Sequence, residues 1–453
     1  MRGIFILIMI IGTSIGVHAQ EKVILSLEDC INFALGNNEQ LKIKQLDKEI
    51  AEAEVRKTIS MGLPQANVNA GLNYNFEPQR SLLDPSSFPG GDSSAMPGMV
   101  QEDIELSFQQ KYDGNIGLVV NQLIFDGSYF VGLQAARTYR ELSTKEHVKS
   151  QIDIVEAVSK AYYNALIAEE QLELLEKNMS RLDTLLRETD QMYLAGFAEK
   201  VDVDRIRVNY NNLKVEYSRT NQLRNISRKL LKFQMGMDLN QPIELEESLE
   251  EVNVDVPVIP SESFDYNQRI EFSQLETNRS LAHLDMKNNR VQYLPKLYAR
   301  LGYGWNTAAS NGGDLFVSRR WLDNGAVGIT ASIPIFDGFL KSNKIQQNKL
   351  QVKQIENQMS YVKKSIDLEI EQSQISLNSQ IETLEVQKQN MELAQEVYDI
   401  SKIKYQEGVG SNIEVINADT SLKESQTNYL NSLFQAITSQ IELKKALGTL
   451  YNN

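Results

Sequence analysis

Ile124-Phe125-Asp126-Gly127 recurs as Ile335-Phe336-Asp337-Gly338, and each copy separates a stretch of alternating apolar and polar residues from a long run without proline. A second pair of segments recurs at nearly the same separation, because Tyr193-Leu194-Ala195-Gly196 corresponds to Tyr405-Gln406-Glu407-Gly408. Self-similarity at a fixed separation is the mark of an internal duplication. The sequence therefore predicts two diverged copies of one unit.

The predicted copies are 20–237 and 265–453, and an acidic linking region with three prolines, expected to be irregular, joins them at 238–264. Each copy is predicted to contain a first helix, two strands and a pair of long helices. The first copy differs from the second in having a longer loop between its strands.

Two stretches in each copy alternate strictly, at about 66–76, 115–125, 297–305 and 326–336. One face is apolar and the other is rich in Asn, Gly, Ser and Thr. Their length of about nine or ten residues and their period of two match transmembrane β-strands. A soluble antiparallel sheet with one wet face gives the same alternation. The aromatic ends of two strands favour the membrane, because aromatic residues gather at its interfaces: these are Tyr74, Phe76, Tyr303 and Trp305.

The proline-free runs at about 128–192 and 339–404 predict helices that extend on the order of 95 Å. Asp126 and Asp337 stand where an N-terminal cap can accept hydrogen bonds from first-turn amides. The chain is expected to turn at Gly196 and Gly408, since glycine permits the positive φ of a helix end, and to return as helices at about 201–236 and 412–448. Helices this long favour coiled coils over an ordinary bundle.

The first 19 residues have the pattern of a secretory signal peptide. Arg2 precedes an apolar run at 4–11, and Val17-His18-Ala19 forms a small-residue cleavage site. The alternative, an anchoring helix, needs about twenty apolar residues. No later stretch approaches eighteen, so any membrane role must be through strands.

Charge and residue usage exclude several classes of function. Asp and Glu number 60 against 46 Lys and Arg, without a basic stripe, so nucleic acid is not an expected partner. Beyond the signal peptide the chain has Cys30, His147 and His283, which form no ligand-spaced cluster. The sequence predicts no metal, no other cofactor, no catalytic residues and no enzyme.

Four strands cannot close a barrel, because two edges would remain open and an unpaired backbone group in lipid costs several kcal/mol. Several copies must therefore combine. Two copies give eight strands, whose interior side chains fill, whereas faces of Asn, Gly, Ser and Thr suit water. Three or four copies are the better expectation.

The duplicated Phe-Asp-Gly, the turns followed by Val201-Asp202-Val203 and Ile413-Glu414-Val415, and the closing Ala446-Leu447-Gly448 resemble the TolC-like outer membrane efflux protein family. The resemblance covers nearly the whole mature chain. It implies a mainly α protein with membrane β-strands: a homotrimer with a twelve-stranded barrel in outer-membrane lipid and an α-helical tunnel in the periplasm.

The resemblance also implies a function and partners. The chain would be the exit duct of a tripartite efflux or type I secretion system, passively passing substrate from an inner-membrane transporter through a periplasmic adaptor (membrane fusion) protein. The alternatives are a periplasmic adaptor or a structural coiled-coil protein of the envelope. Four barrel-type strands in two repeats argue against the adaptor.

The resemblance assigns candidate residues at the two hairpins. Tyr405 and Asp202 match positions that close the aperture in relatives, but the position of their arginine holds Gly410, so the lock must be weaker or built differently. The turns would contact the adaptor through Leu194, Ala195, Gly196, Phe197, Gly408, Val409 and Gly410.

The family's acidic aperture ring corresponds to Glu414, with Asn417 at its second position and Asp419 nearby. In a trimer, carboxylates about 6 Å apart would repel by roughly 3 kcal/mol per pair at an effective dielectric constant of 20, so the ring would attract cations. The alternative for Glu414 is a solvated carboxylate favoured by the helix dipole.

Overall fold

The computed structural model describes residues 23–83, 104–246, 249, 254–257 and 264–451. The predicted signal peptide at 1–19 lies outside this range. The described chain forms two compact units, one of residues up to 48, 143–276 and 358–453, and the other of 49–142 and 277–357.

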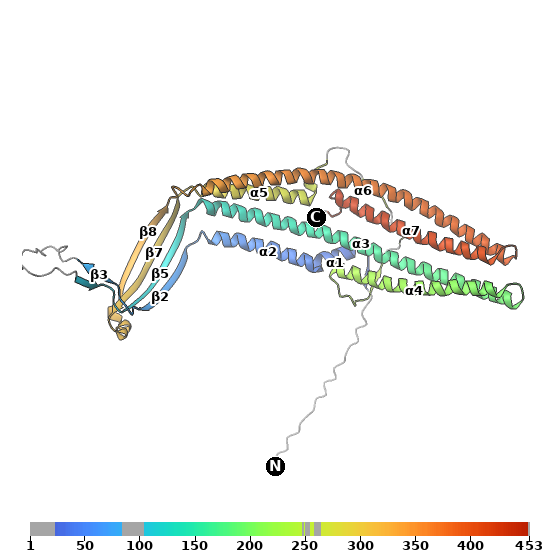
Figure 1. The fold of residues 1–453 in the computed structure, drawn as a ribbon, viewed down its shortest axis with the longest axis horizontal. Coiled ribbons are helices and arrows are strands. Elements are labelled where there is room, and N and C mark those ends of the chain that lie inside the picture. Colours follow the sequence, from blue (N-terminus) through green and yellow to red (C-terminus); the bar gives the residue numbers. More distant parts are fainter. Residues whose placement is uncertain (1–22, 84–103, 247–248, 250–253, 258–263, 452–453) are drawn as a thin grey trace, which may run out of the picture. The chain divides into compact units, whose positions relative to one another are not determined.

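The second unit contains a four-stranded antiparallel sheet with the order β2-β5-β7-β8 (Figure 1). All four strands differ from expectation at their ends. β2 stops before Phe76, β5 begins at Tyr112 rather than near 115, and β7 runs past Trp305. β8 begins at Leu322 and stops short of Pro334, whose nitrogen has no hydrogen to donate to a ladder. Ile335 and Phe336 therefore lie outside the sheet. The strands are β2 (Gln65–Tyr74), β5 (Tyr112–Phe125), β7 (Lys296–Ala309) and β8 (Leu322–Ser332).

Both loops at one end of the sheet have structure of their own. The first contains the short antiparallel pair β3 (Arg80–Leu83) and β4 (Ile104–Ser107). The second contains two 3-10 helices, η4 (Gly312–Phe316) and η5 (Ser318–Arg320). The sequence predicted loops here, without elements of their own.

Seven α-helices make up most of the described chain. Two long ones follow the sheet, as the proline-free runs predict: α3 (Gly127–Leu194) with 68 residues and α6 (Leu340–Gln406) with 67. The others are α1 (Leu27–Asn37), α2 (Glu39–Ser60), α4 (Lys200–Met235), α5 (Ile270–Val291) and α7 (Asn412–Ala446).

An aspartate lies at the start of each long helix. The Ser128 amide donates to Asp126 Oδ1 at 2.8 Å. The Lys341 amide donates to Asp337 Oδ2 at 3.1 Å, and the Lys341 ammonium lies 2.9 Å from the same oxygen. Phe339 has φ 66° and is not helical, so α6 begins one residue later than expected.

The first unit holds the main apolar core, where α1, α3, α4 and α7 pack together around Tyr162, Leu231 and Ile437. Cys30 is fully buried in it. The strand β1 (Val23–Leu25) pairs in parallel with β6 (Ile243–Leu245). The linking region at 238–264, expected to be irregular, thus contributes a strand to this unit.

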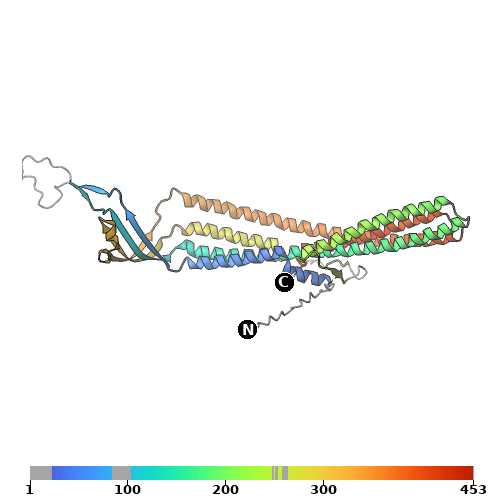
Figure 2. The same cartoon turned by 90° about the horizontal axis from the view of Figure 1, so that it is seen from below.

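Two helical hairpins, α3/α4 and α6/α7, lie side by side in the first unit (Figure 2). A second apolar cluster joins them and includes Leu185, Ile206, Val415 and Leu422, each almost completely buried. This packing fixes the positions of the candidate residues near the turns.

Candidate functional site

The strand register gives the sheet one apolar face and one polar face. Residues paired across antiparallel strands share a face, and Val68, Leu118 and Tyr303 form one such row. The adjacent row consists of Asn69, Gly117, Gly304 and Asn324. The alternation expected from each strand therefore combines into two chemically distinct surfaces.

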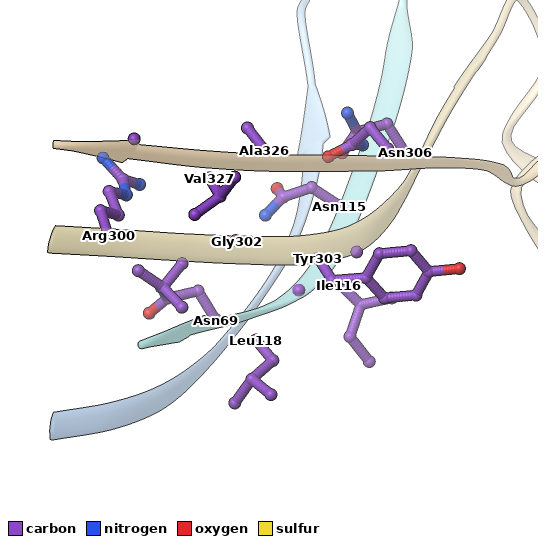
Figure 3. Close-up of a pocket in the computed structure, with 15 residues that line it drawn as sticks. Asn69, Asn115, Ile116, Leu118, Arg300, Gly302, Tyr303, Asn306, Ala326 and Val327 are labelled. Carbon is purple, nitrogen blue, oxygen red and sulfur yellow. The ribbon is translucent and has the colours of Figure 1, made fainter. Parts of the chain in front are cut away.

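A hollow of about 490 Å³ lies over these strands. Figure 3 shows Arg300, Asn115 and Asn306 on one side of the strands and Tyr303 and Leu118 on the other. Amide and guanidinium groups line the polar side, and glycines leave it open. Such a surface suits water and polar solutes.

The two hairpin turns present apolar side chains to solvent. Gly196 and Gly408 have φ 83° and 75°, the left-handed conformation that ends a helix. Phe197 and Val409 beside them are 82% and 78% exposed, and Leu194 is exposed too. Exposed apolar groups at a turn are suited to contact another protein.

Packing in the second hairpin turn explains why position 410 is a glycine. A Cβ at this position would lie 2.9 Å from the Lys404 Cβ and 3.1 Å from the Tyr405 nitrogen. The Gly410 amide donates to the Lys404 carbonyl at 3.0 Å, which closes the turn tightly. An arginine therefore does not fit this turn, and the expected departure from the family pattern is built into the backbone.

Tyr405 and Asp202 have other partners than each other. Tyr405 is buried, and its hydroxyl donates to Thr189 Oγ1 of α3 at 3.3 Å. The Asp202 carboxylate pairs with Arg205 at 3.5 Å, while Asn412 Nδ2 donates to the Asp202 carbonyl at 3.4 Å. The hairpins are thus joined here by neutral hydrogen bonds.

Glu414 and Asn417 are exposed three residues apart on α7, so they share one face of the helix. Asp419 departs from the expectation of an aperture acid, because it is only 7% exposed and lies 2.8 Å from the Arg181 guanidinium of α3. Its charge is matched within the chain and is not presented to solvent.

Arg181 also stacks over the Tyr398 ring of α6, with 4.6 Å between its guanidinium carbon and the ring centroid. We name Arg181, Tyr398 and Asp419 the inter-hairpin cluster. Burial raises the pKa of Asp419, and attraction to Arg181 opposes that shift only in part. Burial likewise raises the pKa of Tyr398 to about 12. No sequence motif links positions so far apart, so this cluster could not be predicted from local sequence.

The described residues lack two features. They contain no group of three or more His, Cys, Asp or Glu side chains arranged to hold a metal ion. None of the described helices is both long enough and apolar enough to cross a bilayer.

The sequence is similar to known outer-membrane efflux proteins. It is 24% identical over 437 residues to the toluene efflux pump outer membrane protein TtgC of Pseudomonas putida, covering 93% of this chain and 83% of that protein. It is 21% identical over 424 residues to the outer membrane protein TolC of Escherichia coli, covering 91% and 80%.

The fold is similar to solved channel structures. The outer membrane protein VceC of Vibrio cholerae superposes with a TM-score of 0.68 at 16% identity, covering 93% of this chain and 96% of that one. CusC superposes with a TM-score of 0.73 at 17% identity, covering 94% and 93%. The pattern of the outer membrane efflux protein family matches residues 30–248 and 267–449. The chain belongs to the outer membrane efflux protein family.

Proposed function

We propose that this chain is the outer-membrane exit duct of a tripartite efflux or secretion system and passes substrate without chemical change. One observation carries the proposal: a four-stranded sheet with an apolar and a polar face, whose edge strands β2 and β8 each pair on one side only within the described chain. In lipid such edges must be paired.

Three copies would supply twelve strands and close a barrel with the apolar face toward lipid and the polar face toward a water-filled lumen. The near-equal lengths of α3 and α6, and of α4 and α7, support the origin of the protomer as two repeats. The duplication would give the trimer six similar strand-and-helix units around its axis.

Apolar stripes on the helices support contacts between copies. Val201, Val208 and Val215 lie at seven-residue steps along α4 and are exposed in the protomer. A second exposed stripe on α6 has the same step and consists of Val386, Leu393 and Ile400. A seven-residue apolar step is the seam of a coiled coil, and we infer that neighbouring protomers cover these seams.

The hairpin turns are the proposed docking points for a periplasmic adaptor protein, which in turn would engage an inner-membrane transporter. Their exposed apolar side chains support this role. The names of the relatives range from a toluene pump to a cobalt-zinc-cadmium resistance protein. We infer that the transporter, rather than the duct, selects the substrate.

We propose an aperture ring made by Glu414 and Asn417 of three protomers, without Asp419. The purified protein should insert into planar bilayers and conduct, and Glu414→Gln should reduce both cation preference and block by divalent cations, because the ring's negative charge is removed. Glu424→Gln, on the same helix, serves as a matched control.

Two outcomes would contradict these proposals separately. Absence of conductance from properly fractionated wild-type protein would contradict the duct itself. Unchanged cation selectivity in a conducting Glu414→Gln channel would contradict only the ring and would favour a solvated helix-start carboxylate at this position.

A further inference from the structure

We propose that Arg300 forms an anion-binding belt on the inner wall of the duct, where it binds carboxylate or phosphate groups of solutes. This inference rests on the proposed trimeric duct, because only closure of the sheet brings three copies of Arg300 to one lumen. The belt would give the polar face a preference for anionic solutes.

Charge is scarce in the four strands of the sheet, and Arg300 differs from the other charged residues there. The strands carry Asp113, Lys296, Arg300 and Asp323. Arg300 makes no hydrogen bond or ion pair with any residue that the structure describes, whereas the other three have partners.

The other three charged side chains each form a hydrogen bond or an ion pair. Both Asp113 oxygens accept hydrogen bonds of 2.7 Å, from the amides of Asn73 and Asn75. Lys296 lies 3.1 Å from Asp126 and forms a pair without net charge. Asp323 accepts from the Tyr303 hydroxyl at 3.4 Å, on the apolar face. Arg300 is thus left as the free cation on the described part of the polar face.

The space around Arg300 is open. In the register, Arg300 lies between Asn121 of β5 and Gly328 of β8. A Cβ added at Gly302 or at Gly328 would meet no atom within 4 Å. Arg300 lines the hollow, and Figure 3 shows its side chain on the same side of the strands as the Asn115 amide. A solute therefore has access to the guanidinium, and amides lie along the same surface.

The distance from Arg300 to the nearest unneutralised carboxylate on the same face of the described sheet, that of Asp113, decides whether the positive charge of Arg300 is offset. Asp113 is paired with Ala308, eight residues along β7 from Arg300, which is about 27 Å at about 3.4 Å per residue. The Debye length at physiological ionic strength is about 8 Å. The Asp113 charge is therefore screened at Arg300, and the belt is locally positive although the whole chain has a formal net charge of −14.

Guanidinium chemistry sets the class of ligand. Its planar fork of N–H donors binds carboxylate and phosphate through two parallel hydrogen bonds. Side-chain amides of the neighbouring asparagines can donate to the remaining oxygens. Rings of arginine favour anions in pores, so the belt should slow and concentrate anionic solutes in the barrel.

The test measures reversal potential in planar bilayers under a KCl gradient at low salt. Arg300→Gln should raise the ratio of K⁺ to Cl⁻ permeability by about twofold or more, and Arg300→Lys should retain the wild-type ratio, because selectivity follows the pore-wall charge. Inorganic phosphate, added at constant ionic strength, should reduce conductance of the wild type but not of Arg300→Gln. Arg319→Gln, in the loop helix η5, is the control for effects of lipid headgroups.

A conducting Arg300→Gln channel with wild-type selectivity and phosphate response would overturn the belt and leave the duct intact. Absence of wild-type conductance would overturn both. If Arg300→Gln does not assemble, phenylglyoxal labelling of the wild-type trimer decides the matter. Phosphate should slow modification of Arg300, but not of Arg319, as measured by mass spectrometry, and equal rates would overturn the belt.

Discussion

The inter-hairpin cluster joins three helices through one buried cation. Arg181 of α3 pairs with Asp419 of α7 and stacks on Tyr398 of α6. The turn at Gly410 has no room for an arginine. We propose that the cluster holds the two hairpins together in this conformation.

Replacement of Arg181 tests whether the inter-hairpin cluster holds the hairpins together. Arg181→Met leaves a buried carboxylate without its partner, which typically lowers stability by about 3–5 kcal/mol. Thermal unfolding of the detergent-solubilised protein, followed by helical circular dichroism, measures the loss. Arg187→Met is the control, because the exposed pair of Arg187 with Asp183 is expected to contribute less than about 1 kcal/mol. Equal losses for the two variants would contradict a structural role for the cluster.

The same variant has a predictable pH dependence. The pKa of Asp419 is already raised by burial in the wild type, and removal of Arg181 raises it further. A carboxyl with a raised native pKa contributes stability that is present below its unfolded pKa and is lost as pH rises through the native value. The loss of stability of Arg181→Met relative to the wild type should therefore be larger at pH 8 than at pH 5. A pH-independent difference would contradict this assignment.

At the scale of elements, the hairpins show how local sequence becomes a contact surface. Glycine ends each outgoing helix, and the reversal leaves apolar side chains exposed to solvent. The sequence predicted the turns and their residues. It did not predict the hydrogen bonds behind them, where Tyr405 donates to Thr189 and Gln406 to Glu188.

Charged substitutions at the turns should separate docking from folding. Phe197→Asp and Val409→Asp should change stability by no more than about 0.5 kcal/mol, because both side chains are exposed at the surface. They should nevertheless abolish co-purification with the periplasmic adaptor, since each places a charge in an apolar contact. Val256→Asp, at another exposed site, should co-purify normally. Undiminished adaptor binding by both turn variants would contradict the proposed docking points.

At the scale of the whole molecule, the faces of the sheet decide which surface meets lipid. Val327 and Ala326 are neighbours on β8 that point to opposite faces, paired with Leu301 and Gly302 respectively. Val327→Lys should lower the yield of folded, membrane-inserted protein, because lysine facing lipid near the bilayer midplane costs about 2–4 kcal/mol. Ala326→Lys should assemble normally in an aqueous lumen.

Outer-membrane fractionation and heat-modifiable migration on gels measure assembly of these two variants. The opposite ranking, with Ala326→Lys failing and Val327→Lys assembling, would reverse the proposed orientation of the sheet. Equal tolerance of both would argue for a sheet with water on both faces.

Periodicity by itself determined the kinds of element and their order. A period of two at Val68, Ala70 and Leu72 makes a strand with one apolar face, and proline-free runs after Asp126 and Asp337 make helices, because these patterns act through neighbours in the chain. Tertiary structure decided what distant residues do. It buried Asp419 against Arg181, turned the linking region into a partner of β1, and left Arg300 without a charged partner among the residues that the structure describes. These outcomes depend on contacts between residues far apart in sequence, for which local pattern carries no signal.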